Sequence, residues 1–520
     1  MARPSTVQLV QQPNDNQAWA PLVLSLDGGG VKGLSSLYIL REIMKRIKQL
    51  DLEDAHNALE DRSNNELPLP CHYFDFIVGT STGGLIAIML GRLRMGVIDC
   101  IKQYLIFSNY IFRPPRLRYI QHYSRWKVQE AVKGVVRQFC GCHGELDRCT
   151  GSEDLRQFDY YERSSDSARA NRTCRAVVLT VREGGTTTFD PRPDDKVILF
   201  RTYNHLPRDA TSDKKNPAEI NPRALDQAQL QIHEACSATS AAPTYFKPIM
   251  LYGRKYIDGG VQANNPSTYA WNEAVQMEHY PGGSQLSINN QVLGGGQAPA
   301  APNSNMPYAL VSLGTGMTET QHQFSLKSMI SFAIKNITDT EAAHKETKDR
   351  AANLSRHYFR FNVPYKSREH GHGGLAKVSM SACEKSRKRP LRNEKASTNE
   401  SAPQRQGTLK LTDLRAQEDQ RIYEEAENAE KGRKGGFKPS KYHYKTFDEI
   451  RKQTLEYCDG ISGEINECAN ILRKQMVKRK NDNGASGASF VAFRQHPDPQ
   501  WKDPKSKGDV STTGSQRSRK

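Results

Sequence analysis

The sequence lacks the features that mark a membrane-spanning or secreted protein. Hydrophobic residues make up only 37% of its 520 positions. The most apolar stretch, residues 77–91, is rich in glycine and shorter than the ~18 residues that a membrane-spanning helix needs. The N-terminus is polar as far as Gln17, and residues 18–26 lack the basic segment that begins a signal peptide. We therefore expect an intracellular, cytoplasmic protein that can associate peripherally with membranes.

The cysteines also lack a recognisable framework. The ten cysteines are scattered, unlike those of a small disulfide-rich scaffold. Cys140, Cys142, His143 and Cys149 lie close together, but a Cys-x-Cys pair lacks the two-to-four residue gap that is typical of zinc sites. We therefore expect no metal.

A strong basic surplus is present, with a net charge of +17 at pH 7. Such a surplus attracts phosphate groups, whether on anionic lipid or on nucleic acid. A solvated basic surface explains the charge equally well.

Short apolar runs alternate with helical patterns along the first two thirds of the chain. Residues 22–26 predict a strand, Asp27–Gly30 a tight turn, and the apolar spacing over 34–47 a helix. The pattern repeats with a strand over 73–78, a turn over 79–84 and a helix from Leu85 to Leu93. Further strands are predicted at residues 176–181, 197–200 and 309–313. This alternation predicts an α/β fold with a mostly parallel sheet and helices on both faces.

Composition divides the chain into segments. The alternating pattern occupies residues 22–335, with a motif core at 24–271 and polar insertions near 144–172 and 281–307, and residues 336–365 continue this domain. Residues 1–21 form a loose lead-in. Residues 366–440 are of low complexity and are expected to be disordered, because they lack an apolar period. Residues 441–480 are expected to be helical, with a capping box at Thr446–Glu449, and residues 481–520 to be a disordered basic tail.

The first motif that carries chemistry is a glycine-rich turn after the first strand. Consecutive glycines let backbone N–H groups point at an anion, which can be a phosphate or the oxyanion of an acyl intermediate. Gly28-x-Gly30-x-x-Gly33 also matches the dinucleotide fingerprint, and Glu53 and Asp54 lie about twenty residues further on. Alone, this motif leaves a nucleotide site, an oxyanion hole and an ordinary turn open.

The second motif is Gly79-Thr80-Ser81-Thr82-Gly83, between a predicted strand and a predicted helix. A nucleophile elbow needs small residues two before and two after its serine, because the sharp turn would otherwise clash with its neighbours. A Ser/Thr-rich turn without a catalytic role has the same local pattern.

The third motif is Asp258-Gly259-Gly260, at the end of a β-type segment. Alone, it is most often an ordinary Asp-Gly turn. Together the three motifs are more specific, because a nucleotide-binding protein needs no elbow whereas a serine acyl hydrolase uses an anion cradle, a nucleophile and a base.

At these residues the chain resembles the patatin-like phospholipases. The resemblance rests on residues 26–33, 79–83 and 258–260, in the family's order. Further similarity lies at residues 235–246 and 312–316. The C-terminal third carries little of it.

The resemblance implies a three-layer α/β/α patatin-like fold and a Ser–Asp dyad. Ser81 would attack the ester carbonyl and Asp258 would accept its proton. A carboxylate has an unperturbed pKa of about 4, so desolvation would have to raise the pKa of Asp258 to make it an effective base. No metal or other cofactor is implied, and calcium should be dispensable.

The implied oxyanion hole lies in the glycine-rich turn, centred on the backbone amides of Gly29 and Gly30. The residues of this turn are Gly28, Gly29, Gly30, Val31, Lys32 and Gly33. Lys32 stands where the family more often has arginine, which keeps the charge but loses the planar fork of a guanidinium.

The resemblance predicts a serine lipid acyl hydrolase of the phospholipase A type, cleaving fatty acyl esters of glycerophospholipids in lipid catabolism. The substrate would be met at a membrane surface, no nucleic acid partner is expected, and no oligomeric state is predicted. Basic side chains interleaved with aromatic ones could contact lipid head groups or form a solvated face. These residues are Lys102, Tyr110, Phe112, Arg113, Arg116, Arg118 and Tyr119.

Two other functions compete with this prediction. A triad-type α/β-hydrolase would need a histidine after Asp258. The candidates are His279, His322, His344 and His357, none of which lies in a recognisable motif. A non-catalytic lipid- or nucleotide-binding regulator would keep Ser81 as a structural residue only.

Overall fold

The computed structural model describes most of the predicted domain and part of the C-terminal third. The described residues are 20–54, 66–111, 123–139, 149–155, 174–183, 197–203, 230–243, 245–276, 306–317, 340–364, 375, 411–431 and 441–482. The predicted lead-in, the two insertions and the basic tail lie mostly outside these residues.

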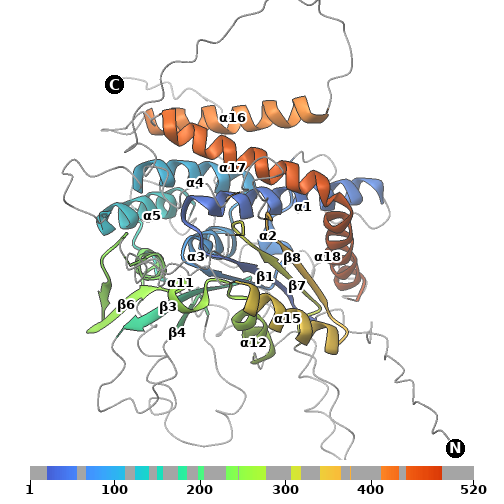
Figure 1. Cartoon of the computed structure of the whole chain (residues 1–520), viewed down its shortest axis with the longest axis horizontal. Coiled ribbons are helices and arrows are strands. Elements are labelled where there is room, and N and C mark those ends of the chain that lie inside the picture. The colour runs from blue at the N-terminus through green and yellow to red at the C-terminus, as the bar shows by residue number, and fades with distance from the viewer. Residues whose placement is uncertain are drawn as a thin grey trace, which may run out of the picture.

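A single sheet of eight strands lies at the centre of the described structure (Figure 1). The strands are β1 (Leu22–Leu26), β2 (Phe76–Thr80), β3 (Arg175–Glu183), β4 (Val197–Arg201), β5 (Ile249–Leu251), β6 (Arg254–Asp258), β7 (Ala309–Leu313) and β8 (His357–Phe361). Their order is β5-β6-β3-β2-β1-β7-β8, and β4 also pairs with β3. The central pairs, from β3 to β8, are parallel, whereas β4, β5 and β6 add antiparallel pairs. The predicted mostly parallel sheet is confirmed.

Alternate residues of the strands enter two apolar clusters on opposite faces of the sheet. In β1, Leu22 and Leu24 pack on one face and Val23 packs on the other. The first face is covered by α1 (Gly33–Glu53), α3 (Thr82–Ala87), α4 (Val97–Ile111), α5 (Arg125–Phe139) and α10 (Ile232–Thr239). The second face is covered by α12 (Ser267–Gln276) and α15 (Glu341–Asn353). The three-layer α/β/α fold is therefore confirmed (Figure 1).

The element boundaries around Ser81 differ from the predicted ones. Pro70–Tyr73 form helix α2, because proline at the first helical position pre-sets the backbone angle, so β2 begins at Phe76 instead of residue 73. Helix α3 begins at Thr82 and continues as a π-helical turn, η3 (Ile88–Arg92). Strand and helix therefore meet directly at Ser81.

Three long helices follow the sheet in the C-terminal third. They are α16 (Leu411–Lys431), α17 (Lys441–Gly460) and α18 (Ser462–Asp482). The disorder predicted for residues 366–440 is wrong at α16, where Ile422 and Ala426 are buried although the rest of the helix is largely polar. The capping box predicted at Thr446 is also wrong, because α17 already begins at Lys441.

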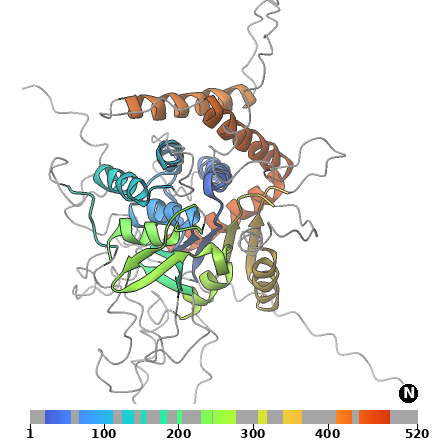
Figure 2. The ribbon, with the colours of Figure 1, turned by 60° about the vertical axis from the view of Figure 1, so that its left-hand side comes forward.

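These helices form an outer layer over the helices of the first face. Helix α16 packs on α4, while α17 and α18 pack on α1 (Figures 1 and 2). Asp419 of α16 pairs with Arg41 of α1 and with Arg451 of α17. Within the described residues, no helix has the length and apolar character needed to cross a bilayer.

Candidate active site

Ser81 occupies the turn between β2 and α3 in a strained backbone conformation. Its φ is 54° and its ψ is −125°. A positive φ is rare for a residue with a side chain and is typical of a nucleophile elbow. The Ser81 amide donates to Thr239 Oγ1 at 2.8 Å, and Thr239 Oγ1 donates to the Leu179 carbonyl at 2.6 Å. Helix α10 and strand β3 thus hold the turn.

Close packing explains the small residues of the elbow. A Cβ atom at Gly79 would overlap the backbone of Gly83, and a Cβ atom at Gly83 would overlap the Leu26 carbonyl at the end of β1. Larger residues at either position would push α3 away from the sheet and displace the Ser81 hydroxyl.

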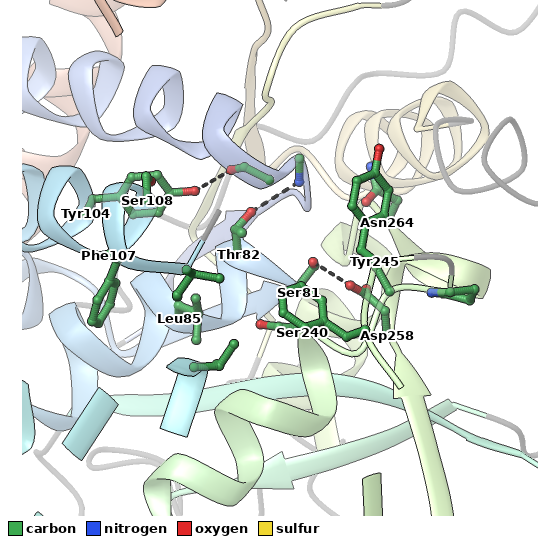
Figure 3. A pocket seen from close by; sticks show the side chains of 17 residues that line it. Ser81, Thr82, Leu85, Tyr104, Phe107, Ser108, Ser240, Tyr245, Asp258 and Asn264 are labelled. Carbon is green, nitrogen blue, oxygen red and sulfur yellow. Dashed lines mark hydrogen bonds between the residues drawn. The ribbon is translucent and has the colours of Figure 1, made fainter. Parts of the chain in front are cut away.

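Asp258 lies at the end of β6, facing Ser81. Its Oδ2 accepts a hydrogen bond from Ser81 Oγ at 2.6 Å, and its Oδ1 accepts one from the Gly260 amide at 2.7 Å (Figure 3). The side chain is buried, and burial raises the pKa of Asp258 to about 7, although both hydrogen bonds lower it. Near neutral pH this carboxyl group is therefore both partly ionised and a stronger base than an ordinary aspartate.

The glycine-rich turn lies directly beside Ser81. A Cβ atom at Gly28 would come within 3.1 Å of Ser81 Cβ. The Gly28 amide donates to the Asn264 carbonyl at 3.1 Å, and the Gly29 amide donates to Thr82 Oγ1 at 3.2 Å, so both amides are engaged in this structure. Of the six turn residues predicted to form an oxyanion hole, Gly29 and Gly30 line the cavity beside Ser81.

Side chains from distant segments hold this turn in place. The Tyr104 hydroxyl, from α4, donates to the Gly30 carbonyl, where the backbone has a positive φ of 57° (Figure 3). Thr315 Oγ1, which follows β7, donates to the Gly28 carbonyl at 2.8 Å.

A buried ion pair fixes the residue that precedes the glycines. Asp27 pairs with Arg360 of β8 through two hydrogen bonds, of 3.0 Å to Oδ1 and 2.6 Å to Oδ2. Both side chains are buried, so the pair is shielded from solvent. The turn is therefore tied to three strands, β1, β7 and β8.

An apolar cavity opens from Ser81 and Asp258. It is walled by side chains from α3, α4, α5 and the loop after α10 (Figure 3). The apolar lining comprises Leu85, Phe107, Ile111, Val128, Ala242, Pro243, Tyr245 and Phe246. Ser240 also lines the cavity, and its buried hydroxyl has no hydrogen-bond partner within the described residues.

The part of the chain that carries these features matches a known family. Residues 24–271 fit the family model described as patatin-like phospholipase. These residues form a patatin-like phospholipase domain. The match contains the glycine-rich turn, Ser81 and Asp258, but ends before β7 and β8.

Curated relatives of the patatin-like domain are distant in sequence. The chain is 28% identical over 329 residues to the calcium-independent phospholipase A2-gamma of Homo sapiens, covering 62% of this chain and 32% of that protein. It is 27% identical over 329 residues to patatin-like protein 1 of Arabidopsis thaliana, covering 60% of this chain and 63% of that protein. The chain thus spans about a third of the length of its mammalian relative.

Several residues that shape the site of the patatin-like domain were not predicted. Tyr104 and Arg360 lie outside every motif, so no local signal points to them. Thr239, Asn264 and Thr315 lie in or beside segments that carry the family resemblance, but their hydrogen bonds emerge only from the fold.

The structure disfavours a dinucleotide site in the patatin-like domain. Glu53 and Asp54 stand at the far end of α1, a 21-residue helix that spans roughly 30 Å. Asp54 there contacts Arg473 of α18 at 3.2 Å. Neither residue lies near the glycine-rich turn, as an acid that binds a ribose would.

A histidine triad finds no support among the described histidines. His344 Nδ1 lies 3.0 Å from the Tyr358 hydroxyl, and His357 packs against the Tyr308 ring. Neither lines the cavity. His279 and His322 lie outside the described residues.

Other predicted contacts are only partly described. Lys102, a candidate for lipid head-group contact, pairs with Glu425 of α16, and Tyr110 packs against Lys127. Phe112, Arg113, Arg116, Arg118 and Tyr119 lie outside the described residues, as do Cys140, Cys142 and His143.

Proposed function

We propose that this protein is a serine lipid acyl hydrolase of the phospholipase A type, acting on glycerophospholipids at a membrane surface in lipid catabolism. The observation that carries the proposal is the 2.6 Å hydrogen bond from Ser81 Oγ to Asp258 Oδ2, beside the glycine-rich turn and at the polar end of an apolar cavity. The resemblance to proteins named phospholipases supports the same assignment.

In the first half-reaction Ser81 Oγ attacks the ester carbonyl while Asp258 accepts its proton. The strained backbone of Ser81 and the short bond to Asp258 orient the hydroxyl before substrate binds. The amide of Gly30, and that of Gly29 once its hydrogen bond to Thr82 Oγ1 is exchanged for one to the substrate, stabilise the negative charge that develops on the carbonyl oxygen. Asp258 then delivers the proton to the leaving alcohol, which leaves an acyl-serine.

In the second half-reaction water takes the place of the alcohol. Asp258 removes a proton from the water, which attacks the acyl-serine, and the fatty acid leaves as Ser81 regains its proton. The Gly260 amide holds the other carboxylate oxygen throughout, so Oδ2 keeps its direction. A buried carboxyl with a pKa of about 7 is suited to both roles, because it can accept and return a proton near neutral pH.

The fatty acyl chain occupies the apolar part of the cavity. Its apolar lining includes Phe107 and Ile111 of α4, Val128 of α5 and Phe246. Burying methylene groups there supplies ~0.8 kcal/mol each and leaves the ester at the polar end. The dyad requires no metal for the proton transfers, so activity should persist when calcium is chelated.

Covalent labelling tests the proposal against both alternatives. A fluorophosphonate probe should modify the wild type at Ser81, and Ser81→Ala should not react. The Ser237→Ala variant is a matched control, because Ser237 Oγ is committed to the His233 carbonyl at 2.7 Å. Absence of labelling in folded wild type would favour a non-catalytic regulator. Loss of labelling when a histidine that follows Asp258 is replaced would favour the triad-type hydrolase instead.

A further inference from the structure

Three exposed apolar side chains lie near the cavity. Trp126, Met250 and Tyr252 are 61%, 58% and 49% exposed, more than any other large hydrophobic side chain in the described residues. Trp126 is in the first turn of α5, Met250 is in β5, and Tyr252 is in the turn between β5 and β6.

The sheet register places the β5–β6 hairpin on the same edge as Ser81. Strand β2 ends at Thr80, opposite Leu179, but β3 continues to Glu183, which pairs with Lys255 of β6. At ~3.3 Å per residue, this extension reaches about 13 Å beyond the level of Thr80. The hairpin therefore projects from the carboxyl edge of the sheet, where the dyad lies.

The start of α5 is joined to this hairpin and to the cavity wall. Arg125 Nη1 donates to the Pro248 carbonyl at 3.1 Å, just before β5. The Tyr123 ring stacks on Tyr245, with ring centroids 6.3 Å apart, and Tyr245 lines the cavity. Helix α5 and β6 lie on one side of the molecule in both views, and α15 lies on the other (Figures 1 and 2).

The charged side chains around these three residues are mostly basic. Residues 245–257 include Lys247, Arg254 and Lys255, all exposed, and no acidic residue. Arg125 is also exposed. Lys255 pairs with Glu183 at 3.2 Å, yet half of its side chain remains accessible. Aromatic and basic side chains together are typical of surfaces that bind the interface of an anionic bilayer.

The geometry of the β5–β6 turn does not favour a tyrosine at position 252. Its φ is 49° and that of Gly253 is 74°, as in a two-residue hairpin turn that favours Asn-Gly. A bulky side chain is disfavoured in this left-handed conformation. Replacement by asparagine should therefore preserve the turn, which makes Tyr252→Asn a clean test of the aromatic ring.

We infer that Trp126, Met250 and Tyr252, with the basic residues beside them, form a docking face that inserts into the head-group region of a phospholipid bilayer. Docking there sets the mouth of the cavity against the lipid, so that an acyl chain reaches Ser81 without crossing water. This inference deepens the proposed function and rests on it for the identity of the substrate.

Vesicle sedimentation tests the docking face separately from catalysis. In a Ser81→Ala background, which cannot consume lipid, the protein should bind phosphatidylcholine vesicles that contain phosphatidylserine. The triple variant Trp126→Ser/Met250→Ser/Tyr252→Asn should bind at least about tenfold more weakly, because interfacial binding scales with buried apolar area. Tyr252→Asn alone should weaken binding without lowering the melting temperature.

The matched control is Leu52→Ser/Leu354→Ser. These leucines are 42% and 40% exposed at the opposite edge of the sheet, where α1 ends and β8 begins, so their replacement should leave vesicle binding unchanged. Equal binding by the triple variant and its parent, or no binding by the parent, would overturn the inference.

Activity measurements separate the two proposals. With Ser81 present, the triple variant should hydrolyse a soluble short-chain ester at the wild-type rate and vesicles at least about tenfold more slowly. A wild type inactive on both substrates would contradict the proposed function. The vesicle sedimentation result would still show whether Trp126, Met250 and Tyr252 bind the bilayer.

Discussion

At the scale of single residues, Asp258 meets two requirements that conflict in an exposed carboxylate. A base must be ionised at the working pH, yet it must also hold a proton firmly enough to take one from a serine hydroxyl. Burial raises the pKa of Asp258 to about 7, and the hydrogen bonds from Ser81 and Gly260 keep that rise moderate. The environment therefore gives Asp258 a pKa near neutral pH, where the histidine of a catalytic triad also titrates.

The pH dependence of kcat/KM should report this group. Only the ionised form accepts the Ser81 proton. The logarithm of kcat/KM for a soluble ester should therefore rise by one for each pH unit below an apparent pKa of about 7 and level off above it. Aliquots held at each pH and returned to pH 8 control for unfolding. A plateau that already begins near pH 5 would mean that Asp258 has an ordinary pKa or is not the base.

Tyr104 is expected to position the oxyanion-binding amides. Tyr104→Phe removes the hydrogen bond to the Gly30 carbonyl and should lower kcat about tenfold, equal to ~1.4 kcal/mol, with little change in KM, because the interaction serves the transition state. Tyr110→Phe is the control, since Tyr110 lies on the same helix but is exposed. Steady-state kinetics on a soluble ester, with melting temperatures, would check this; a change confined to KM would argue against a positioning role.

The sequence predicts the residues that local motifs mark and misses those that the fold brings in. Ser81 and Asp258 each occupy a turn whose chemistry is visible within five positions, which is why both could be named. Tyr104 and Arg360 are an ordinary tyrosine in an apolar helix and an ordinary arginine in a strand. Their roles arise from packing between segments far apart in the sequence.

At the scale of elements, buried charge as well as apolar contact fixes the C-terminal helices. Arg479 of α18 is fully buried and binds Asp75 through both carboxylate oxygens, at 3.2 and 2.6 Å. Asp75 Oδ2 also accepts a hydrogen bond from the Leu22 amide at 2.8 Å. The Arg479–Asp75 pair therefore joins α18 to the starts of β1 and β2.

Breaking this pair should destabilise the whole fold. Arg479→Met leaves Asp75 buried without its partner, which should cost ~3 kcal/mol in the free energy of unfolding measured with denaturant. Arg421→Met serves as the comparison, because Arg421 is 81% exposed beside Glu425 and its loss should cost less than ~0.5 kcal/mol. Equal midpoints for the two variants would show that α18 is not integral to the fold.

These charged contacts explain why the sequence predicts this region poorly. Helix α16 has a mostly polar sequence, and its buried Asp419 pairs with arginines from α1 and α17. A search for apolar periodicity cannot detect such partners. Helix α18, by contrast, buries Ile465, Cys468, Leu472 and Met476 at helical spacing, which is a pattern that a search for apolar periodicity detects.

At the scale of the whole molecule, the candidate active site is contacted by parts of the chain beyond the family match. Strands β7 and β8 follow residue 271, yet they complete the sheet beside β1 and supply the contacts from Thr315 and Arg360 to the glycine-rich turn. The C-terminal helices cover α1 and α4 and share their apolar core. The described residues thus form one structure in which one edge carries the dyad, the cavity and the docking face.

Fatty acid release from phosphatidylcholine vesicles, measured with calcium chelated, tests most directly whether Ser81 is the nucleophile of a calcium-independent phospholipase. Wild type should release fatty acid, and Ser81→Ala, purified and shown to be folded, should release none above background, because the variant lacks the nucleophile. Wild-type activity in Ser81→Ala would show that Ser81 is not the nucleophile, and no release by folded wild type from any glycerophospholipid offered would show that the protein is not a phospholipase.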